Sequence, residues 1–240
     1  MSYSIESIRK AVSGLNDHIK FYSDAIKSGE TLKVSISTGN KKIGRVMNVS
    51  LAPIVTCGSA CNVCMGLCYD IKAVLQYGNV MKARARNTAI YRMNSDLYFA
   101  QIRGAIRRRR SNKLFRWHVA GDIPNVDYLA EMVAIARENP DFIFWTYTKQ
   151  YHIVNAYVAQ HGGDMREAIP TNLSIMFSVW RGLPCVNPYS FPVFDVIFND
   201  DTTEEKLRKM EYFRCPGNCD LCKEHNRGCV TGESASVWEH

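Results

Sequence analysis

Strand-like and helix-like segments alternate through the second half of the chain, and this alternation is the strongest constraint on its fold. The strand-like segments are residues 114–120, 142–148, 173–180 and 193–198, and the helix-like segments are residues 127–138, 151–160 and 203–213. Repeated strand–helix units favour a parallel sheet or barrel. With 240 residues, 46 % of them hydrophobic, the chain is long enough for one sizeable core. We therefore predict an α/β protein.

Polar side chains recur on one side of the alternation in these strands. Thr146 and Thr148 lie on the partly polar side of one strand, and Ser174 and Ser178 on that of the next. A parallel sheet covered on both faces would normally be apolar on both. The pattern therefore favours an incomplete (β/α) barrel whose interior holds a ligand near the C-terminal ends of the strands. An antiparallel sheet with one face in water is the alternative.

The first half of the chain is predicted to begin with a helix and a hairpin. Apolar residues recur at three- and four-residue steps from residue 5 to residue 26, which predicts an amphipathic helix ending near residue 29. Residues 31–37 and 42–51 are β-prone and flank Gly39-Asn40, which predicts a hairpin turn. Residues 69–110 are helix-rich, with breaks expected at Gly78 or at Asn94-Ser95.

Eight of the nine cysteines fall into two groups. The first group is Cys57, Cys61, Cys64 and Cys68, and the second is Cys215, Cys219, Cys222 and Cys229; each opens with the spacing C-x3-C-x2-C. The chain shows no exported leader among its first ten residues and no run of eighteen apolar residues, so we expect a cytoplasmic protein without a membrane partner. In a reducing cytosol, closely spaced cysteines are more often metal ligands or redox centres than disulfides.

Two kinds of metal centre fit these groups differently. Structural zinc takes four thiolates, usually as two close pairs, and the second group could meet that requirement. The first group places four thiols within twelve residues, between a predicted strand and a predicted helix. Such a short loop suits an iron-sulfur cubane, and a cubane held by three thiolates keeps one iron open to another ligand. Spacing alone leaves open whether the thiols divide as three plus five or as four plus four.

A cysteine loop of this spacing after the first strand of a βα-repeat protein resembles the radical S-adenosylmethionine (radical SAM) superfamily. More closely, four segments together resemble the gene product eighty-eight family of phage proteins, which is radical-SAM-like and also ends in a cysteine-rich segment. They are Ser50-Leu-Ala-Pro-Ile-Val-Thr-Cys57, Cys64-Met-Gly-Leu-Cys68-Tyr69, His118-Val-Ala-Gly-Asp122 and Tyr147-Thr-Lys149. This resemblance covers residues 43–240 and leaves the N-terminal helix outside.

The resemblance implies a [4Fe-4S] cluster, held by three cysteines, whose fourth iron chelates the amino and carboxylate groups of S-adenosylmethionine. Two features depart from the superfamily pattern. Val63 stands before the third cysteine where an aromatic residue is usual, so the ligand triad could be Cys57, Cys64 and Cys68 or another three of the four. The Gly-Gly-Glu segment that receives the amino group of the cofactor is absent, and Gly121-Asp122 occupies a comparable place.

Several polar residues near the strand ends are candidates for cofactor binding. His118 lies on the partly polar side near Asp122, and it could contact cofactor or substrate or be a satisfied core histidine. Hydroxyl groups could bind the ribose or carboxylate of a nucleoside cofactor, and the candidates for this role are Thr146, Thr148, Ser174 and Ser178. No motif selects a substrate.

The net charge of +7 permits an anionic partner without establishing one. Arg107 to Arg110 could bind the phosphates of a nucleic acid, or they could be the solvated end of a helix, where cations suit the helix dipole. The leading hypothesis is a radical SAM-type enzyme that uses an electron donor such as a flavodoxin or ferredoxin. The alternatives are a metal-stabilised nucleic-acid-binding protein with closed clusters and a non-radical iron-sulfur enzyme.

Three parts are predicted along the chain. Residues 1–40 would form the N-terminal helix and a hairpin strand, and residues 41–212 a partial (β/α) barrel of the radical SAM type that carries the first cluster loop. Residues 213–240 would form a cysteine-rich tail that binds a second [4Fe-4S] cluster or zinc. For a phage-encoded protein, the expected location is the cytoplasm of the host cell.

Overall fold

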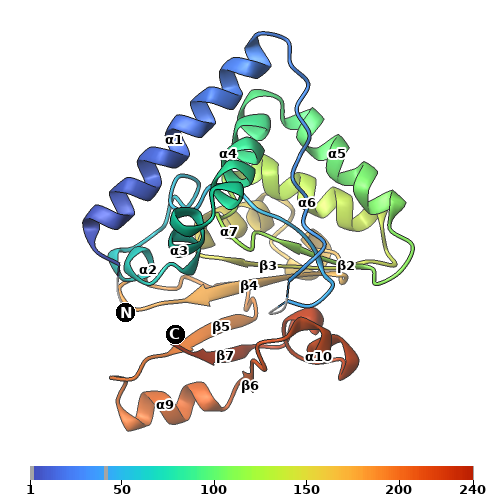
Figure 1. Cartoon of the computed structure of the whole chain (residues 1–240). Helices are drawn as coiled ribbons and strands as arrows, with labels where there is room; N and C mark the ends of the chain where they lie inside the picture. The colour runs from blue at the N-terminus through green and yellow to red at the C-terminus, as the bar shows by residue number, and fades with distance from the viewer. Residues whose placement is uncertain (1–2, 41–42, 240) are drawn as a thin grey trace.

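A parallel sheet is the centre of the computed structural model, which describes residues 3–40 and 43–239 (Figure 1). In that part of the chain the sheet has seven strands in the order β1-β2-β3-β4-β5-β7-β6, and all of their pairings are parallel. The strands are β1 (Met47–Val49), β2 (Leu114–Trp117), β3 (Ile143–Thr148), β4 (Leu173–Val179), β5 (Val193–Ile197), β6 (Phe213–Arg214) and β7 (Ala235–Trp238). The sheet is open, with β1 and β6 as its edges. The α/β prediction is confirmed, and the antiparallel alternative is wrong.

Helices connect these strands, and Figure 1 shows α1 to α7 above the sheet and α9 and α10 below it. They are α1 (Ile5–Lys27), α2 (Asn62–Gly66), α3 (Tyr69–Gln76), α4 (Gly78–Met93), α5 (Ser95–Arg108), α6 (Val126–Glu138), α7 (Tyr151–Gln160), α8 (Met165–Ala168), α9 (Thr203–Met210), α10 (Cys219–Glu224) and a 3-10 turn, η1 (Gly228–Thr231). Both predicted breaks occur, because α3, α4 and α5 are separated at Tyr77 and at Asn94. None of the described helices is long and apolar enough to cross a membrane.

The main core lies between the sheet and helices α4 to α7. Phe115 and Trp117 of β2, with Phe144 of β3, pack there against Phe99 of α5 and Tyr128 of α6. A second core joins α1 to α3 and α4 through small and branched side chains, among them Leu15, Ile71 and Ala89. The amphipathic stripe predicted for the opening helix is therefore covered by the helical layer.

The predicted hairpin around Gly39-Asn40 is wrong as a regular pair of strands. Among the described residues it survives only as isolated antiparallel bridges, Ser37 with Asn48 and Asn40 with Gly44, and residues 41 and 42 lie outside the described part. The preceding segment is extended, but its backbone bonds to helix side chains: the amide of Val34 donates to Gln101 and that of Ser35 to Asn87. Side-chain acceptors on α5 and α4 replace the neighbouring strand.

The polar sides predicted for the four strands do not form one polar face. Residues paired across parallel strands share a face, and the register pairs Arg116 with Trp145 and Trp145 with Ser174. Thr146 instead pairs with Ile175 and points with it toward the helical layer. Polar positions therefore alternate between the faces from strand to strand, and the prediction of a uniformly polar interior is wrong.

The cysteine-rich tail extends the same sheet. β7 lies between β5 and β6, and Phe194 and Phe213 both pair with Ala235. Figure 1 shows β6, β7 and α10 on the opposite side of the central strands from α4 to α7. A third apolar cluster forms on this side, in which Cys222 and Cys229 are buried with Trp145 and Met176. The tail thus covers the sheet face that the helices leave open.

Candidate metal and cofactor site

The first cysteine group lies in a loop between β1 and α3, at the C-terminal end of the sheet. The loop is held by its own backbone bonds, since the amide of Cys57 donates to the carbonyl of Ile54 at 3.1 Å. Cys61 caps α2: its sulfur accepts from the amide of Cys64 at 3.5 Å, while the thiol donates to the carbonyl of Arg181. Cys68 occupies the cap position of α3. Two short helices therefore set the spacing of the four thiols.

Burial dominates the ionisation of these thiols. It raises the pKa of Cys57, and the nearby Asp122 carboxylate and the sulfurs of Cys68 and Cys64 raise it further. Burial likewise raises the pKa of Cys68 to about 11 and raises the pKa of Cys64, which Lys149 opposes. Burial thus favours the protonated thiols of Cys57, Cys64 and Cys68, so a metal or cluster would have to displace their protons.

Asp122 connects the ends of β2 and β3 beside this group. Its Oδ1 accepts from the hydroxyl of Thr148 at 2.6 Å and from the amide of Ile123 at 2.8 Å, and its Oδ2 accepts from the amide of Lys149 at 2.9 Å. Burial raises the pKa of the carboxyl, and these three hydrogen bonds counteract it. The structure therefore places Asp122 and Thr148 together, next to Cys57.

Gly121 allows the loop after β2 to touch the loop that carries the cysteines. Its φ is +77°, and a Cβ at this position would stand 2.7 Å from Oγ1 of Thr56 and 2.9 Å from Cβ of Leu51. Thr56 directly precedes Cys57, so a side chain at residue 121 would push against the cysteine loop. Glycine is required here by both the backbone conformation and the close approach.

His118 and Thr146 belong to a buried network under the helices. Nε2 of His118 lies 3.1 Å from the hydroxyl of Tyr128, which lies 3.0 Å from that of Tyr98, and Nδ1 lies 3.5 Å from Oγ1 of Thr146. Burial, with the nearby Arg116 cation, lowers the pKa of His118 to about 3. With a φ of +52°, His118 also ends β2 three residues before the predicted end of that strand. It is a neutral, satisfied core histidine.

Ser178 and Ser174 lie on the other sheet face, in different surroundings. Oγ of Ser178 accepts from Nζ of Lys149 at 3.2 Å and from the indole of Trp180 at 2.9 Å, and the Lys149 ammonium lies 4.7 Å from the Trp180 ring centre. Lys149 also opposes the rise in the pKa of the Cys64 thiol, so it lies near that thiol. Ser178, as a partner of Lys149, therefore borders the first cysteine group. Ser174 instead faces the tail, where a Cβ on Gly232 would stand 3.3 Å from its hydroxyl.

The four tail cysteines are close neighbours of one another. Burial raises the pKa of Cys229 to about 12, and the sulfurs of Cys215, Cys222 and Cys219 raise it further, opposed by a hydrogen bond with Tyr147. Burial also raises the pKa of Cys222 to about 11, with further contributions from Cys215 and Cys219. The four sulfurs are thus electrostatic neighbours of one another, and Cys229 lies beside Tyr147 of β3.

Arg116 is a cation that faces these thiols from β2. Its guanidinium lies 4.7 Å from the ring centre of Tyr147 and interacts with Cys219 and Cys229, and its Nε is buried with no hydrogen-bond partner among the described residues. An ion pair for it is likewise absent from the described part of the chain. A buried cation without a carboxylate is costly unless an anion is nearby. Thiolates of a metal centre would supply that anion, so the tail fits a metal.

The ligand spheres themselves are not assembled. Within residues 3–40 and 43–239, no three His, Cys, Asp or Glu side chains converge in a way that could hold a metal ion. The thiol of Cys61, for example, donates to the carbonyl of Arg181 rather than facing the other cysteines. The fit to a metal rests on the donor chemistry and on the charge of Arg116.

The similarity of this chain to known proteins includes the first cysteine group. The model of the family described as Gene product 88 matches residues 25–182, well over half of the chain. The chain belongs to the Gene product 88 family. The Gene 88 protein of Mycobacterium phage L5 is 37 % identical over 71 residues, which is 30 % of this chain and 26 % of the phage protein. No solved structure matches the chain.

The Gene product 88 match includes the first cysteine group, Gly121-Asp122 and β4, and it ends before the tail. The chain thus spans about a quarter of the phage relative's length in the aligned part.

Two residues of the site were not among the candidates from sequence. Arg116 could have been found as the charged residue inside an otherwise apolar strand, and Lys149 as the cation that follows a strand end.

Proposed function

We propose that the chain is a radical SAM-type iron-sulfur enzyme built on a partial (β/α) barrel. The observation that carries the proposal is the meeting of the first cysteine group with Asp122 and Lys149 at the C-terminal ends of β1, β2 and β3. In parallel α/β sheets, ligands bind at this edge of the strands. The open sheet agrees with a barrel that closes only in part.

A [4Fe-4S] cluster bound here would supply the electron that cleaves a carbon–sulfur bond of S-adenosylmethionine, giving methionine and a 5′-deoxyadenosyl radical. The electron would come from a donor such as a flavodoxin or ferredoxin in the host cytoplasm. The cluster and cofactor perform the difficult chemistry, and the protein orients them and excludes water.

Cys57, Cys64 and Cys68 are the proposed ligands of this cluster. All four thiols are near one another, since Cys64 raises the pKa of Cys57 and of Cys68 and Cys61 raises that of Cys64. Cys61 differs because it donates to the carbonyl of Arg181 and caps α2. Substituting Cys61 with serine should therefore retain iron, because a serine hydroxyl can make the same cap. Loss of iron in Cys57→Ser, Cys64→Ser and Cys68→Ser with retention in Cys61→Ser would support the assignment, and loss in Cys61→Ser alone would contradict it.

Asp122 is the proposed partner of the amino group of the cofactor. A carboxylate offers about four acceptor positions, and three are already filled by Thr148, Ile123 and Lys149. One position would remain for an ammonium group. Gly121 would keep the backbone close to the cofactor, and Lys149, which bonds to both Asp122 and the Ser178 hydroxyl, would border the same site. Roles for His118, Thr146 and Ser174 at the cofactor have no support in the contacts of these residues.

The tail is proposed to hold a second metal centre, either a [4Fe-4S] cluster or zinc, with its four cysteines as ligands. Arg116 would balance part of the negative charge of the thiolates. The measurement is metal content in wild type, Arg116→Lys and Arg116→Met. Arg116→Met should lose the tail metal and Arg116→Lys should retain most of it, whereas equal metal content in all three would refute the role of the charge.

The first experiment for the proposed function is electron paramagnetic resonance of anaerobically purified, dithionite-reduced protein, with iron and sulfide quantified. A [4Fe-4S] signal that shifts on adding S-adenosylmethionine, together with release of 5′-deoxyadenosine, would support the proposal. An unshifted signal would favour closed clusters or a non-radical iron-sulfur enzyme. Zinc without iron, with salt-sensitive binding of DNA or RNA, would favour the nucleic-acid-binding alternative, for which the exposed Arg107, Arg108 and Arg110 remain available.

A further inference from the structure

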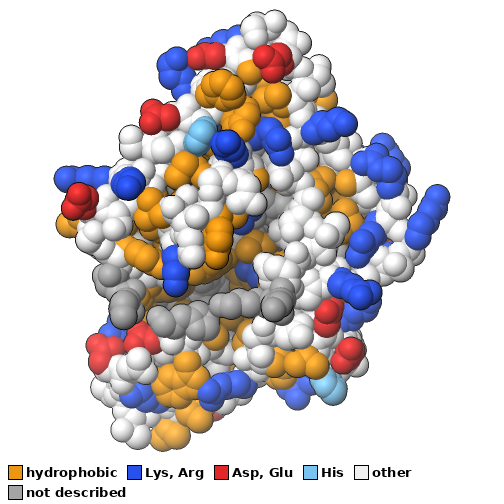
Figure 2. Space-filling model, viewed as in Figure 1, with side chains coloured by type: hydrophobic (Ala, Val, Ile, Leu, Met, Phe, Trp, Pro, Cys, Tyr) orange, Lys and Arg blue, Asp and Glu red, His pale blue; other side chains and the backbone are white. Residues whose placement is uncertain are grey.

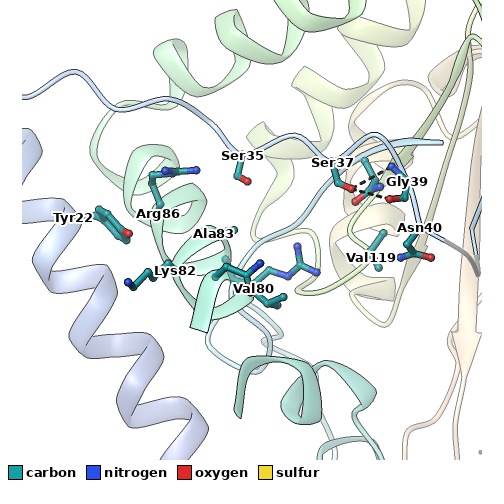
Figure 3. Close-up of a pocket in the computed structure, with 13 residues that line it drawn as sticks. Tyr22, Ser35, Ser37, Gly39, Asn40, Val80, Lys82, Ala83, Arg86 and Val119 are labelled. Carbon is teal, nitrogen blue, oxygen red and sulfur yellow. Dashed lines mark hydrogen bonds between the residues drawn. The ribbon is translucent and has the colours of Figure 1, made fainter. Parts of the chain in front are cut away.

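A cavity lies between α1, α4 and the segment 35–40, and none of the described residues that line it is a cysteine. Its volume is about 580 Å³. Figure 3 shows Tyr22 of α1 and Lys82 and Arg86 of α4 on one side, and Ser35, Ser37 and Asn40 of the extended segment on the other. Val119, at the end of β2, forms the far wall. The walls therefore come from parts of the chain that are distant in sequence.

The extended wall of this cavity is fixed in place. Nδ2 of Asn87 donates to the carbonyl of Ser35 at 2.9 Å and to that of Ser50 at 3.0 Å, and its Oδ1 accepts from the amide of Ser35 at 2.7 Å. Asn87 is buried on α4, so the segment is anchored to the same helix that carries the cations. The cavity is consequently a preformed feature of the fold.

Positive charge in the cavity exceeds what its surroundings balance. Lys82, Arg84 and Arg86 line it, and no Asp or Glu is among the described lining residues. Arg84 is balanced by Asp70, which accepts from its Nε at 3.1 Å and from its Nη2 at 3.3 Å. The described part of the chain offers no carboxylate to Lys82 or Arg86, and Nε of Arg86 is buried without a hydrogen-bond partner. A bound anion would balance the charges of Lys82 and Arg86 and accept a hydrogen bond from Nε of Arg86.

Neutral polar groups complement these cations. Hydroxyl and amide side chains line the cavity, and they are Tyr22, Ser35, Ser37, Asn40, Asn48 and Asn79. A guanidinium, an ammonium and several neutral donors around one concave space are the groups that bind phosphoryl oxygens. The volume is within the range of about 300–1,000 Å³ that is typical of small-molecule sites.

We propose that this cavity binds a small molecule carrying a phosphoryl or diphosphoryl group, through Lys82 and Arg86. The proposal goes beyond the chemistry of the cysteine groups and does not rest on it. A phosphorylated small molecule is favoured over a nucleic acid because the cations line a concave space, whereas the exposed arginines at the end of α5 form a separate surface, at the right-hand edge in Figure 2.

The test is calorimetric titration of the purified full-length protein with inorganic pyrophosphate at low salt. The variants are Lys82→Gln and Arg86→Gln, and the matched control is Arg107→Gln, which removes an exposed cation outside the cavity. Each cavity variant should weaken binding, Arg86→Gln by roughly tenfold because it loses a charge-assisted hydrogen bond. Arg107→Gln should bind like wild type.

Three results would overturn the proposal: absence of pyrophosphate binding at low salt, equal affinity in Lys82→Gln and wild type, or an equal loss in Arg107→Gln. Lys82 is exposed, so its substitution does not threaten the fold even if Arg86→Gln fails to fold. A short single-stranded DNA provides a further comparison. Tighter binding of the DNA than of pyrophosphate, weakened by Arg107→Gln, would assign the positive charge to nucleic acid instead.

Discussion

Replacing Gly121 with alanine tests the close approach of the β2 loop to the first cysteine loop. Gly121 has a φ of +77°, and an added Cβ would lie 2.7 Å from the hydroxyl of Thr56, 2.9 Å from Cβ of Leu51 and 3.0 Å from its carbonyl oxygen. Two penalties therefore act at this position, one from the backbone conformation and one from the contact with a neighbouring loop.

The two penalties can be given magnitudes. A left-handed conformation costs a non-glycine residue about 1–2 kcal/mol, and an added methyl group in a tightly packed site costs about 1–3 kcal/mol. Gly121→Ala should therefore lower the free energy of unfolding by about 2–5 kcal/mol. Gly162 is the matched control, because its φ is +90° and nothing lies within 4 Å of the position that an added Cβ would occupy. Gly162→Ala should show the conformational penalty alone, about 1–2 kcal/mol.

The assay is urea unfolding of the wild type and both variants, followed by tryptophan fluorescence and by far-ultraviolet circular dichroism. The difference between Gly121→Ala and Gly162→Ala isolates the contact with Thr56 and Leu51. Equal destabilisation of the two variants would refute the close approach. Iron uptake by Gly121→Ala should also fall, because the substitution displaces the residue that directly precedes Cys57.

Three further predictions concern buried ionisable groups. Lys209→Met removes the ammonium that lies 2.8 Å from Asp201 and 3.7 Å from Asp195, and it should lower the free energy of unfolding by about 3–5 kcal/mol, measured in urea. Burial opposes ionisation of Asp201, but hydrogen bonds from Lys209 and Arg181 lower its pKa to about 2 from an ordinary 3.8. The stability it contributes is present above the ordinary value and is lost as the pH falls toward 2, a loss that Asp201→Asn should not show. His118, whose pKa is lowered to about 3 from 6.5, takes up its proton more readily in the unfolded chain, so stability should fall as the pH drops from about 6.5 toward 3, and His118→Gln should reduce that slope.

Much of the fold could be read from periodicity. The helix Tyr151–Gln160 was predicted to the residue, and β3 and β4 to within one residue at each end, because strongly apolar segments flanked by turn residues specify their own structure. β2 is shorter than predicted because His118 adopts a positive φ, which side-chain contacts with Tyr128 support. The hairpin failed for a related reason, since Asn87 and Gln101 supply its backbone partners from helices.

The register between neighbouring strands places the polar candidates in different surroundings, and a single sequence does not show that register. Thr146 and Thr148 alternate with Tyr147 as expected, yet one hydroxyl lies near His118 and the other bonds to Asp122. Ser174 and Ser178 share a face but lie against different partners, the tail and Lys149. The alternation along each strand therefore identified the polar positions correctly. It did not show which polar side chains contact one another in the fold.

The position of the tail follows from Arg116. A cation at this point of β2 must face the sheet side opposite Phe115 and Trp117, and on that side the structure places the four tail cysteines and Tyr147. If the tail held no metal, its thiols would be neutral and the buried cation would have no anion beside it in the described part of the chain. A guanidinium without a carboxylate partner among the described residues is instead understandable if the tail carries negative charge. The second cysteine group and the central sheet would then form one electrostatic unit, so loss of the tail metal should destabilise β2 and β3 as well as the tail. Hydrogen exchange at the amides of Arg116 and Tyr147, before and after chelation, would measure that coupling, and unchanged exchange would refute it.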